Sequence, residues 1–177
     1  MTDDALPPSK SAVSATPGSP CLSIRHHLLP GDVGSITNLH SLLYSDQDWD
    51  YTFDCYVAMP LAEFVLRSSP RERIWIVEQG GRIRGCAAIV EVSKTQAQLR
   101  WLLLHPGLRG RGLGRRLVEE ALAFCRDSQY GSVILWTVEG LPESAALYRS
   151  AGFVETERVT HELWGRNVTE IRFEIKL

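Results

Sequence analysis

The stretch "LRGRGLGRRL", residues 108–117, decides the fold, because it sets three glycines among four arginines between two regular patterns. The apolar run "WLLLHP" precedes it, and its nearly continuous apolar centre predicts a strand buried on both faces that stops at Pro106. Residues 112–129 follow with one apolar stripe at helical spacing, formed by Leu113, Leu117, Ala121, Phe124 and Cys125. The sequence therefore predicts a strand, a glycine-rich turn and an amphipathic helix.

A glycine-rich turn in this place can direct consecutive backbone N–H groups at one point. Gly110, Gly112 and Gly114 permit close approach and unusual φ angles, and the helix adds the positive end of its dipole. We therefore predict an anion site rimmed by arginines. The spacing is neither the G-x-G-x-x-G of dinucleotide-binding folds nor that of an ATP-binding P-loop, which needs a lysine. A bare arginine–glycine arm for nucleic acid would not lie between a strand and a helix.

The rest of the chain shows further strand and helix patterns. We predict strands at residues 23–29, 97–106, 132–139, 153–164 and 169–177, a Gly-Gly hairpin within 73–93, and helices at 32–45, 52–68, 112–129 and 142–152. Asp32 is the expected N-cap of the first helix, and Pro60 is expected to kink or interrupt the second. The order β-α-α-β-β-β-α-β-α-β-β indicates an α/β domain with a mixed central sheet of six or seven strands and about four helices.

Length and composition limit the class of protein. The 177 residues allow one domain, which we place at residues 22–177. Residues 1–21 are rich in proline and serine, and we predict a disordered tail there. The net charge of −2 argues against nucleic acid as a partner, and the apolar runs are too short to span a membrane. Without a signal peptide or CxxC pair, the four cysteines indicate reduced thiols in a cytoplasmic protein that holds no metal.

Two segments in order carry a family resemblance. The run "LLLHPGLRGRGLGRRLVEEAL" and, about thirty residues later, "ALYRSAGF" resemble the two best local signatures of the GCN5-related N-acetyltransferase (GNAT) family. The C-terminal half also resembles the acetyltransferase part of regulators fused to a MarR-type DNA-binding domain, although we expect no such domain in these residues. The resemblance implies a GNAT-like sheet whose two central parallel strands are splayed to admit coenzyme A.

The resemblance also implies where acetyl-CoA would bind as co-substrate. In the family, the pyrophosphate rests on backbone amides of the glycine-rich loop, and the pantetheine arm pairs with the strand before it. Carried over, the cofactor-binding residues are Leu102, Leu103, Leu104, Arg109, Gly110, Arg111, Gly112, Leu113, Gly114, Arg115 and Tyr148. Many members carry Asn where this sequence has Leu141, so one cofactor contact is expected to be missing.

Tyr148 matches the tyrosine that the family places near the thioester sulfur, where a phenol can protonate the leaving thiolate. The alternative is a core aromatic that packs the short helix onto the sheet. A general base is harder to find, because the strand "QLRWLLL" lacks the acid that family members often use. Glu91 and Glu139 are the substitutes, and each can equally be a surface carboxylate.

The acceptor would bind near the loop between the first two helices, as is usual in the family. Its candidate residues are Tyr44, Trp49, Asp50 and Phe53, an aromatic and acidic set that suits a cationic amine. The alternative is a solvated helix cap with the aromatic rings in the core. Polyamines, lysine side chains, protein N-termini and amino-sugars all stay open as acceptors, and a homodimer is left open as well.

Three functions therefore compete. The first is an enzyme that transfers acetyl from acetyl-CoA to a primary amine by direct attack in a ternary complex. The second keeps the fold as a non-catalytic acyl-CoA sensor or interaction module. The third, nucleic-acid binding through the arginine loop, would show affinity that falls steeply with added salt.

Overall fold

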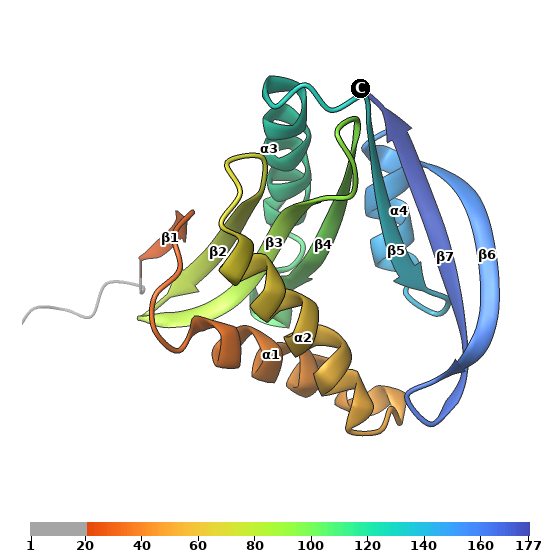
Figure 1. The fold of residues 1–177 in the computed structure, drawn as a ribbon. Helices are drawn as coiled ribbons and strands as arrows, with labels where there is room; N and C mark the ends of the chain where they lie inside the picture. The colour runs from red at the N-terminus through yellow and green to blue at the C-terminus, as the bar shows by residue number, and fades with distance from the viewer. Residues whose placement is uncertain (1–20) are drawn as a thin grey trace, which may run out of the picture.

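The computed structural model describes residues 21–177, so the predicted tail lies outside the described residues except for Cys21. Seven strands form one mixed sheet in the order β1-β2-β3-β4-β5-β7-β6 (Figure 1). The strands are β1 (Leu22–Arg25), β2 (Arg73–Gln79), β3 (Arg82–Glu91), β4 (Gln96–Leu104), β5 (Ser132–Val138), β6 (Val154–Leu163) and β7 (Arg166–Lys176). The predicted element order and the mixed sheet are confirmed.

Helices cover both faces of the sheet. One face carries α1 (Asp32–Leu43) and α2 (Thr52–Arg67), whose apolar side chains pack on residues of β2 and β3. The opposite face carries α3 (Leu113–Asp127) and α4 (Pro142–Ser150), which share a larger buried cluster with the central strands. In α3 the fully buried side chains recur at the spacing that the sequence predicted, because one stripe of the helix faces the sheet.

The parallel pair at the centre of the sheet is short. β4 pairs with β5 only from Gln96–Ser132 to Gln98–Ile134. Beyond these rungs the two strands diverge toward their carboxyl ends, as Figure 1 shows. On its other side β5 pairs with β7 along its whole length, so the gap between β4 and β5 is a local opening inside a continuous sheet.

β4 is irregular where the gap begins. Trp101 has a φ of 51°, a left-handed conformation that bulky residues rarely adopt, and the register with β3 shifts between Cys86 and Ala88. The expected burial of this strand on both faces is therefore incomplete: Leu99 and Leu103 are buried, whereas residues 100–102 are partly exposed.

Three local expectations differ from the structure. The first strand ends at Arg25, well before residue 29. Asp32 is the first residue of α1 and not its N-cap; that place belongs to Gly31, whose φ of 93° suits glycine. Pro60 does not interrupt the second helix, because α2 runs through it from Thr52 to Arg67.

Asp32 instead fixes the start of α1 to the sheet. Its two carboxylate oxygens accept hydrogen bonds from Arg25 at 2.7 and 2.8 Å, and the Leu29 N–H donates to it at 2.6 Å. Burial pushes the pKa of Asp32 upward, but these hydrogen bonds outweigh it, and the pKa lies below its ordinary value. The buried pair joins β1 to α1.

We predict that Asp32→Asn lowers the free energy of unfolding at pH 7 by about 3 kcal/mol, because it leaves the buried Arg25 guanidinium without its main partner. Urea denaturation measures the change. Since a lowered pKa stabilises the fold only while the carboxyl is ionised, the difference from wild type should shrink as pH falls below about 4. Asp54→Asn, at an exposed carboxylate, is the control and should change stability by less than about 0.5 kcal/mol. Equal stability of Asp32→Asn and wild type at pH 7 would contradict this role.

Candidate active site

A cavity of about 440 Å³, which we call the loop cavity, opens between the end of β4, the glycine-rich loop and α4. All of the predicted cofactor-binding residues except Arg111 and Leu113 line it. Arg111 is exposed on the surface, and the Leu113 side chain is buried in the core against the sheet. The predicted set is thus largely brought together in one hollow.

The loop gives this cavity a positive wall. Gly110 and Gly112 have φ angles of 72° and 77°, where a side chain would be strained. Gly112 caps α3, and the first bond of the helix runs from the Arg116 N–H to its carbonyl. The backbone N–H groups of residues 113–115 therefore have no acceptor within the helix, and the positive end of the helix dipole lies at the same place.

The end of β4 forms the second wall. Leu102 and Leu104 line the loop cavity, and β4 has no strand partner on this side beyond Gln98. The Arg109 Nε donates to the Leu104 carbonyl at 2.9 Å and so ties the loop to the strand. An extended ligand could pair with the free backbone edge while its anionic end meets the loop.

A smaller cavity of about 130 Å³, which we call the aromatic cavity, lies on the other side of the gap. Its tyrosine, tryptophan and phenylalanine rings come from the segment between α1 and α2, from α2, β4, β5 and α4, and from the β6–β7 turn. They are those of Tyr44, Trp49, Phe53, Tyr56, Trp101, Trp136, Tyr148 and Trp164. Trp49 holds the group together, with ring centroids 4.4 Å from Trp164 and 4.7 Å from Phe53. These rings offer flat apolar and cation-binding surfaces.

The two cavities meet at Tyr44, Leu102, Leu141, Ser144 and Tyr148, which line both. Tyr148 is 6% exposed and packs its ring near Phe153 and Phe173. Burial raises its pKa, and Tyr44 raises it further. The phenol therefore keeps its proton at neutral pH and stands at the junction. Its packing role and a chemical role are both compatible with this place.

Of the predicted acceptor residues, Tyr44, Trp49 and Phe53 line the aromatic cavity and Asp50 does not. The Asp50 carboxylate accepts hydrogen bonds from the backbone N–H and the hydroxyl of Thr52, at the start of α2. Its backbone N–H donates to the Trp164 carbonyl at 3.0 Å. Asp50 thus shapes the loop that carries Trp49 without facing the cavity.

The two predicted general bases lie outside both cavities. Glu91, at the far end of β3 from the loop, accepts a hydrogen bond from Arg71 at 3.2 Å. Glu139, just after β5, is exposed and pairs with Arg158 on β6. Each carboxylate has a surface arginine as partner, and the structure does not bring either one to Tyr148.

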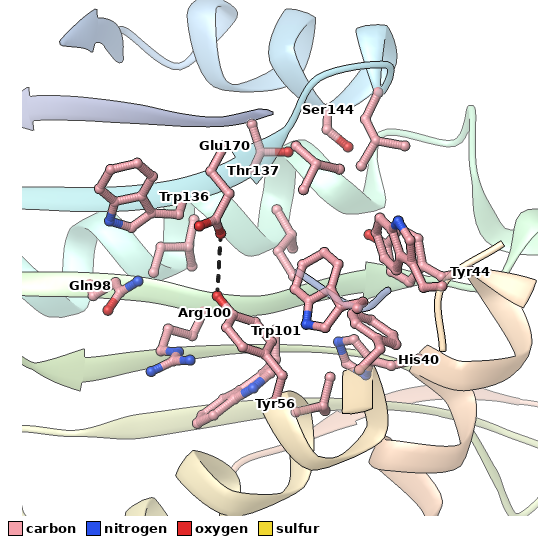
Figure 2. A pocket seen from close by; sticks show the side chains of 18 of the residues that line it. His40, Tyr44, Tyr56, Gln98, Arg100, Trp101, Trp136, Thr137, Ser144 and Glu170 are labelled. Carbon is pink, nitrogen blue, oxygen red and sulfur yellow. Dashed lines mark hydrogen bonds between the residues drawn. The ribbon is translucent and has the colours of Figure 1, made fainter. Parts of the chain in front are cut away.

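Figure 2 shows the aromatic cavity with the carboxylate of Glu170 among its rings and Tyr56 opposite. Sequence reasoning missed this residue. It also missed the other polar side chains that line the cavity, which are His40, Gln98, Arg100, Thr137 and Ser144. The alternation on the last strand was a usable signal: with Ile171 and Phe173 facing the core, Glu170 must face the other way.

The comparisons with known proteins agree with this architecture. A model of the acetyltransferase (GNAT) family matches residues 36–153, more than half of the chain. The chain belongs to this family. The sequence resemblance is thus confirmed at the level of the GNAT family.

Three relatives illustrate how far the likeness extends. N-acetyltransferase family 8 member 2 of Rattus norvegicus is 33% identical over 87 residues, covering 46% of this chain and 38% of the rat protein. The N-alpha-acetyltransferase RimI of Mycobacterium tuberculosis is 34% identical over 90 residues, covering 49% of this chain and 54% of its own. An uncharacterised N-acetyltransferase of Schizosaccharomyces pombe is 28% identical over 146 residues, covering 79% of this chain and 87% of the yeast protein. The chain spans less than half the length of the rat, human and mouse relatives.

Solved structures share the fold. A protein of Salmonella typhimurium with its cofactor acetyl-CoA superimposes with a TM-score of 0.65 at 20% identity, over 88% of this chain and 94% of the other. Spermidine N-acetyltransferase of Vibrio cholerae, in complex with CoA and spermine, superimposes with a TM-score of 0.65 at 22% identity, over 88% of this chain and 95% of the other. Among the described residues, no helix has the length and apolar content needed to cross a bilayer.

Proposed function

We propose that this protein transfers an acetyl group from acetyl-CoA to a primary amine by direct attack within a ternary complex. One observation carries the proposal: the loop cavity and the aromatic cavity meet at the buried phenol of Tyr148, in the gap between β4 and β5. A thioester that entered from one side would meet an amine that entered from the other. We also propose the cytoplasm as its compartment, in keeping with four free thiols.

The loop cavity suits coenzyme A as co-substrate. The free N–H groups at the start of α3, with Arg109 and Arg115 beside them, suit a diphosphate. The open edge of β4 at residues 102–104 suits the amides of the pantetheine arm. The acetyl-CoA-bound Salmonella protein has the same fold, which supports this placement.

The chemistry needs one proton donor at the sulfur. The lone pair of the amine attacks the carbonyl carbon of the thioester, the carbon–sulfur bond breaks, and the nitrogen loses one proton as the new amide forms. In this proposal Tyr148 gives its proton to the departing sulfur, and the proton lost by the nitrogen restores the phenol. The raised pKa of Tyr148 keeps the phenol protonated at neutral pH, so the proton donor is present when the sulfur departs.

The aromatic cavity suits an acceptor with a positive charge. Its rings can hold a cation over their faces, and Glu170 adds a negative charge. Arg100 lines the same cavity, so acceptors that also carry a carboxylate belong in any test. The Vibrio neighbour is a spermidine acetyltransferase with spermine in its structure, which supports an amine without naming the one used here.

The test is a free-thiol release assay with acetyl-CoA across an amine panel of polyamines, amino acids, histone-like peptides and aminoglycosides. We expect release of coenzyme A with at least one class, together with the acetylated amine by mass spectrometry. Tight binding of acetyl-CoA without release for any amine would favour the non-catalytic sensor, or the interaction module, of the same fold.

We predict that Tyr148→Phe lowers kcat by about 100-fold or more, because the sulfur must then leave without a proton donor. Calorimetry with coenzyme A should show unchanged affinity, since the ring and its packing remain. Tyr51→Phe, at a tyrosine that is 82% exposed, is the matched control and should leave kcat unchanged. An unaltered kcat in Tyr148→Phe would show that this tyrosine only packs in the core and does not take part in the reaction.

We also predict that Gly112→Ala weakens coenzyme A binding about tenfold. A side chain at a φ of 77° costs about 1–2 kcal/mol, and the loop would move away from its binding shape. Gly81→Ala, at a φ of 71° in the β2–β3 turn, is the matched control with equal strain far from the loop. It should lose similar stability and keep its affinity. Equal affinities of the two variants in calorimetry would argue against the loop as the diphosphate site.

A further inference from the structure

The carboxylate of Glu170 stands in an unusual position for a charged group. It lies on β7, where it pairs in register with Val138 of β5 and Val159 of β6. Its side chain is only 13% exposed and lines the aromatic cavity. Burying a carboxylate costs free energy unless other groups bind it. The groups that bind Glu170 therefore indicate what it does in the cavity.

The two oxygens of Glu170 have different partners. One oxygen is hydrogen-bonded to His161 Nε2 of β6 at 2.7 Å, and the imidazole tautomer decides which of the two atoms carries the hydrogen. The other lies 3.5 Å from the hydroxyl of Tyr56 on α2, a long contact that the dashed line in Figure 2 marks. One oxygen is thus firmly held, and the other faces the cavity with bonding capacity to spare.

His161 joins this carboxylate to water. It lies on β6, the edge strand of the sheet, and its side chain is 43% exposed. The ring nitrogens of an imidazole can both accept and donate a proton. The pair therefore forms a short path that begins at the inner wall of the cavity and ends in solvent.

We propose that Glu170 removes the proton from the acceptor ammonium and that His161 passes that proton to solvent. The proposal rests on the acetyltransferase function proposed above. The nitrogen–hydrogen bond breaks, its electron pair stays on nitrogen, and an oxygen–hydrogen bond forms on Glu170. The proton then moves to Nε2 of the His161 tautomer that carries its hydrogen on Nδ1, and the Nδ1 hydrogen leaves to water, which restores the carboxylate. Exchange with water returns the ring to its starting tautomer.

The groups around Glu170 suit this exchange. Arg100 on β4 lines the same cavity and places a positively charged side chain in it beside this carboxylate. Tyr56 from α2 is kept neutral because burial and then the charge of Glu170 raise its pKa. The lining residues of β5 carry no charge. Glu170 is therefore the one carboxylate among the described residues that line the aromatic cavity.

His40 on α1 is the rival base in this cavity. It is 6% exposed, and its Nδ1 lies 2.8 Å from the Ile36 carbonyl. Burial lowers its pKa, with the hydrogen bond opposing, so the ring is neutral. The described contacts of His40 include no counterpart of the exposed His161 that bonds Glu170. Glu170 and His40 can be tested by separate substitutions.

The first test compares Glu170→Gln with Glu174→Gln, which removes a carboxylate from the same face of the same strand where it pairs with Arg172. With the amine that the wild type acetylates, Glu170→Gln should lower kcat/KM by about 100-fold. Its defect should shrink as pH rises, and also with amines of low basicity, because both supply the free amine. Glu174→Gln should match wild type. Coenzyme A titration and thermal melting serve as the checks on folding.

The second test uses His161→Gln, at an exposed residue whose replacement leaves the core untouched. We expect kcat to fall about tenfold or more and added imidazole to restore it by carrying protons to water. A purely structural role of the pair would show neither imidazole rescue nor a smaller defect with weakly basic amines. This variant also tests the proposal if Glu170→Gln does not fold.

The outcomes are distinct. If the wild type releases no thiol with any amine, the proposed function fails and the proton path has no reaction to serve. If the wild type is active and Glu170→Gln keeps its rate and pH profile, the proton path alone is overturned. A pH-dependent loss in His40→Gln with an unaffected Glu170→Gln would assign the base to α1 instead.

Discussion

The early end of the pairing between β4 and β5 is the constraint on which this site depends. Only the rungs from Gln96 to Gln98 join the two strands, and peptide groups beyond them lack the partner that a sheet normally supplies. A buried peptide group without a hydrogen bond costs about 1–3 kcal/mol. The sheet tolerates the gap because β4 pairs with β3 on its other side and β5 pairs with β7 along all of its length. The opening then becomes a place where another molecule can supply the missing bonds.

The two buried clusters hold the gap open from opposite faces. One cluster packs α3 and α4 against the central strands, and the other packs α1 and α2 against β2 and β3. A third, smaller cluster joins α2 to the β6–β7 hairpin through Phe53, Val57, Trp164 and Val168. Because the third cluster includes walls of the aromatic cavity, the same contacts that secure the hairpin also shape the acceptor side.

The sequence indicated the fold and the loop cavity well, because both depend on local patterns. Residues 102–115 are continuous in the chain, so a strand, a glycine turn and a helix start could be recognised together. Tyr148 came from a second continuous signature. Arg111 is exposed in the loop, whereas Leu113 is the first residue of α3 and is buried in the core.

The aromatic cavity was harder to predict, since its lining residues come from α1, α2, α4, β4, β5, β7 and the β6–β7 turn. The alternation of β7 shows that Glu170 faces away from the core, but it does not show that β7 lies between β5 and β6. That placement alone brings the carboxylate into the cavity. Glu91 lies on the strand before β4 and Glu139 at the end of the next one, and no sequence pattern reveals that Arg71 and Arg158 bind them.

The insertion of β7 between β5 and β6 also bears on how the molecule assembles. β5 has three rungs with β4 and seven with β7, although residues 166–176 are made well after residues 132–138. Until they emerge from the ribosome, β5 has one short neighbour and β6 has none. The acceptor side must therefore form late, through contacts between distant segments, which is a slow kind of step in folding.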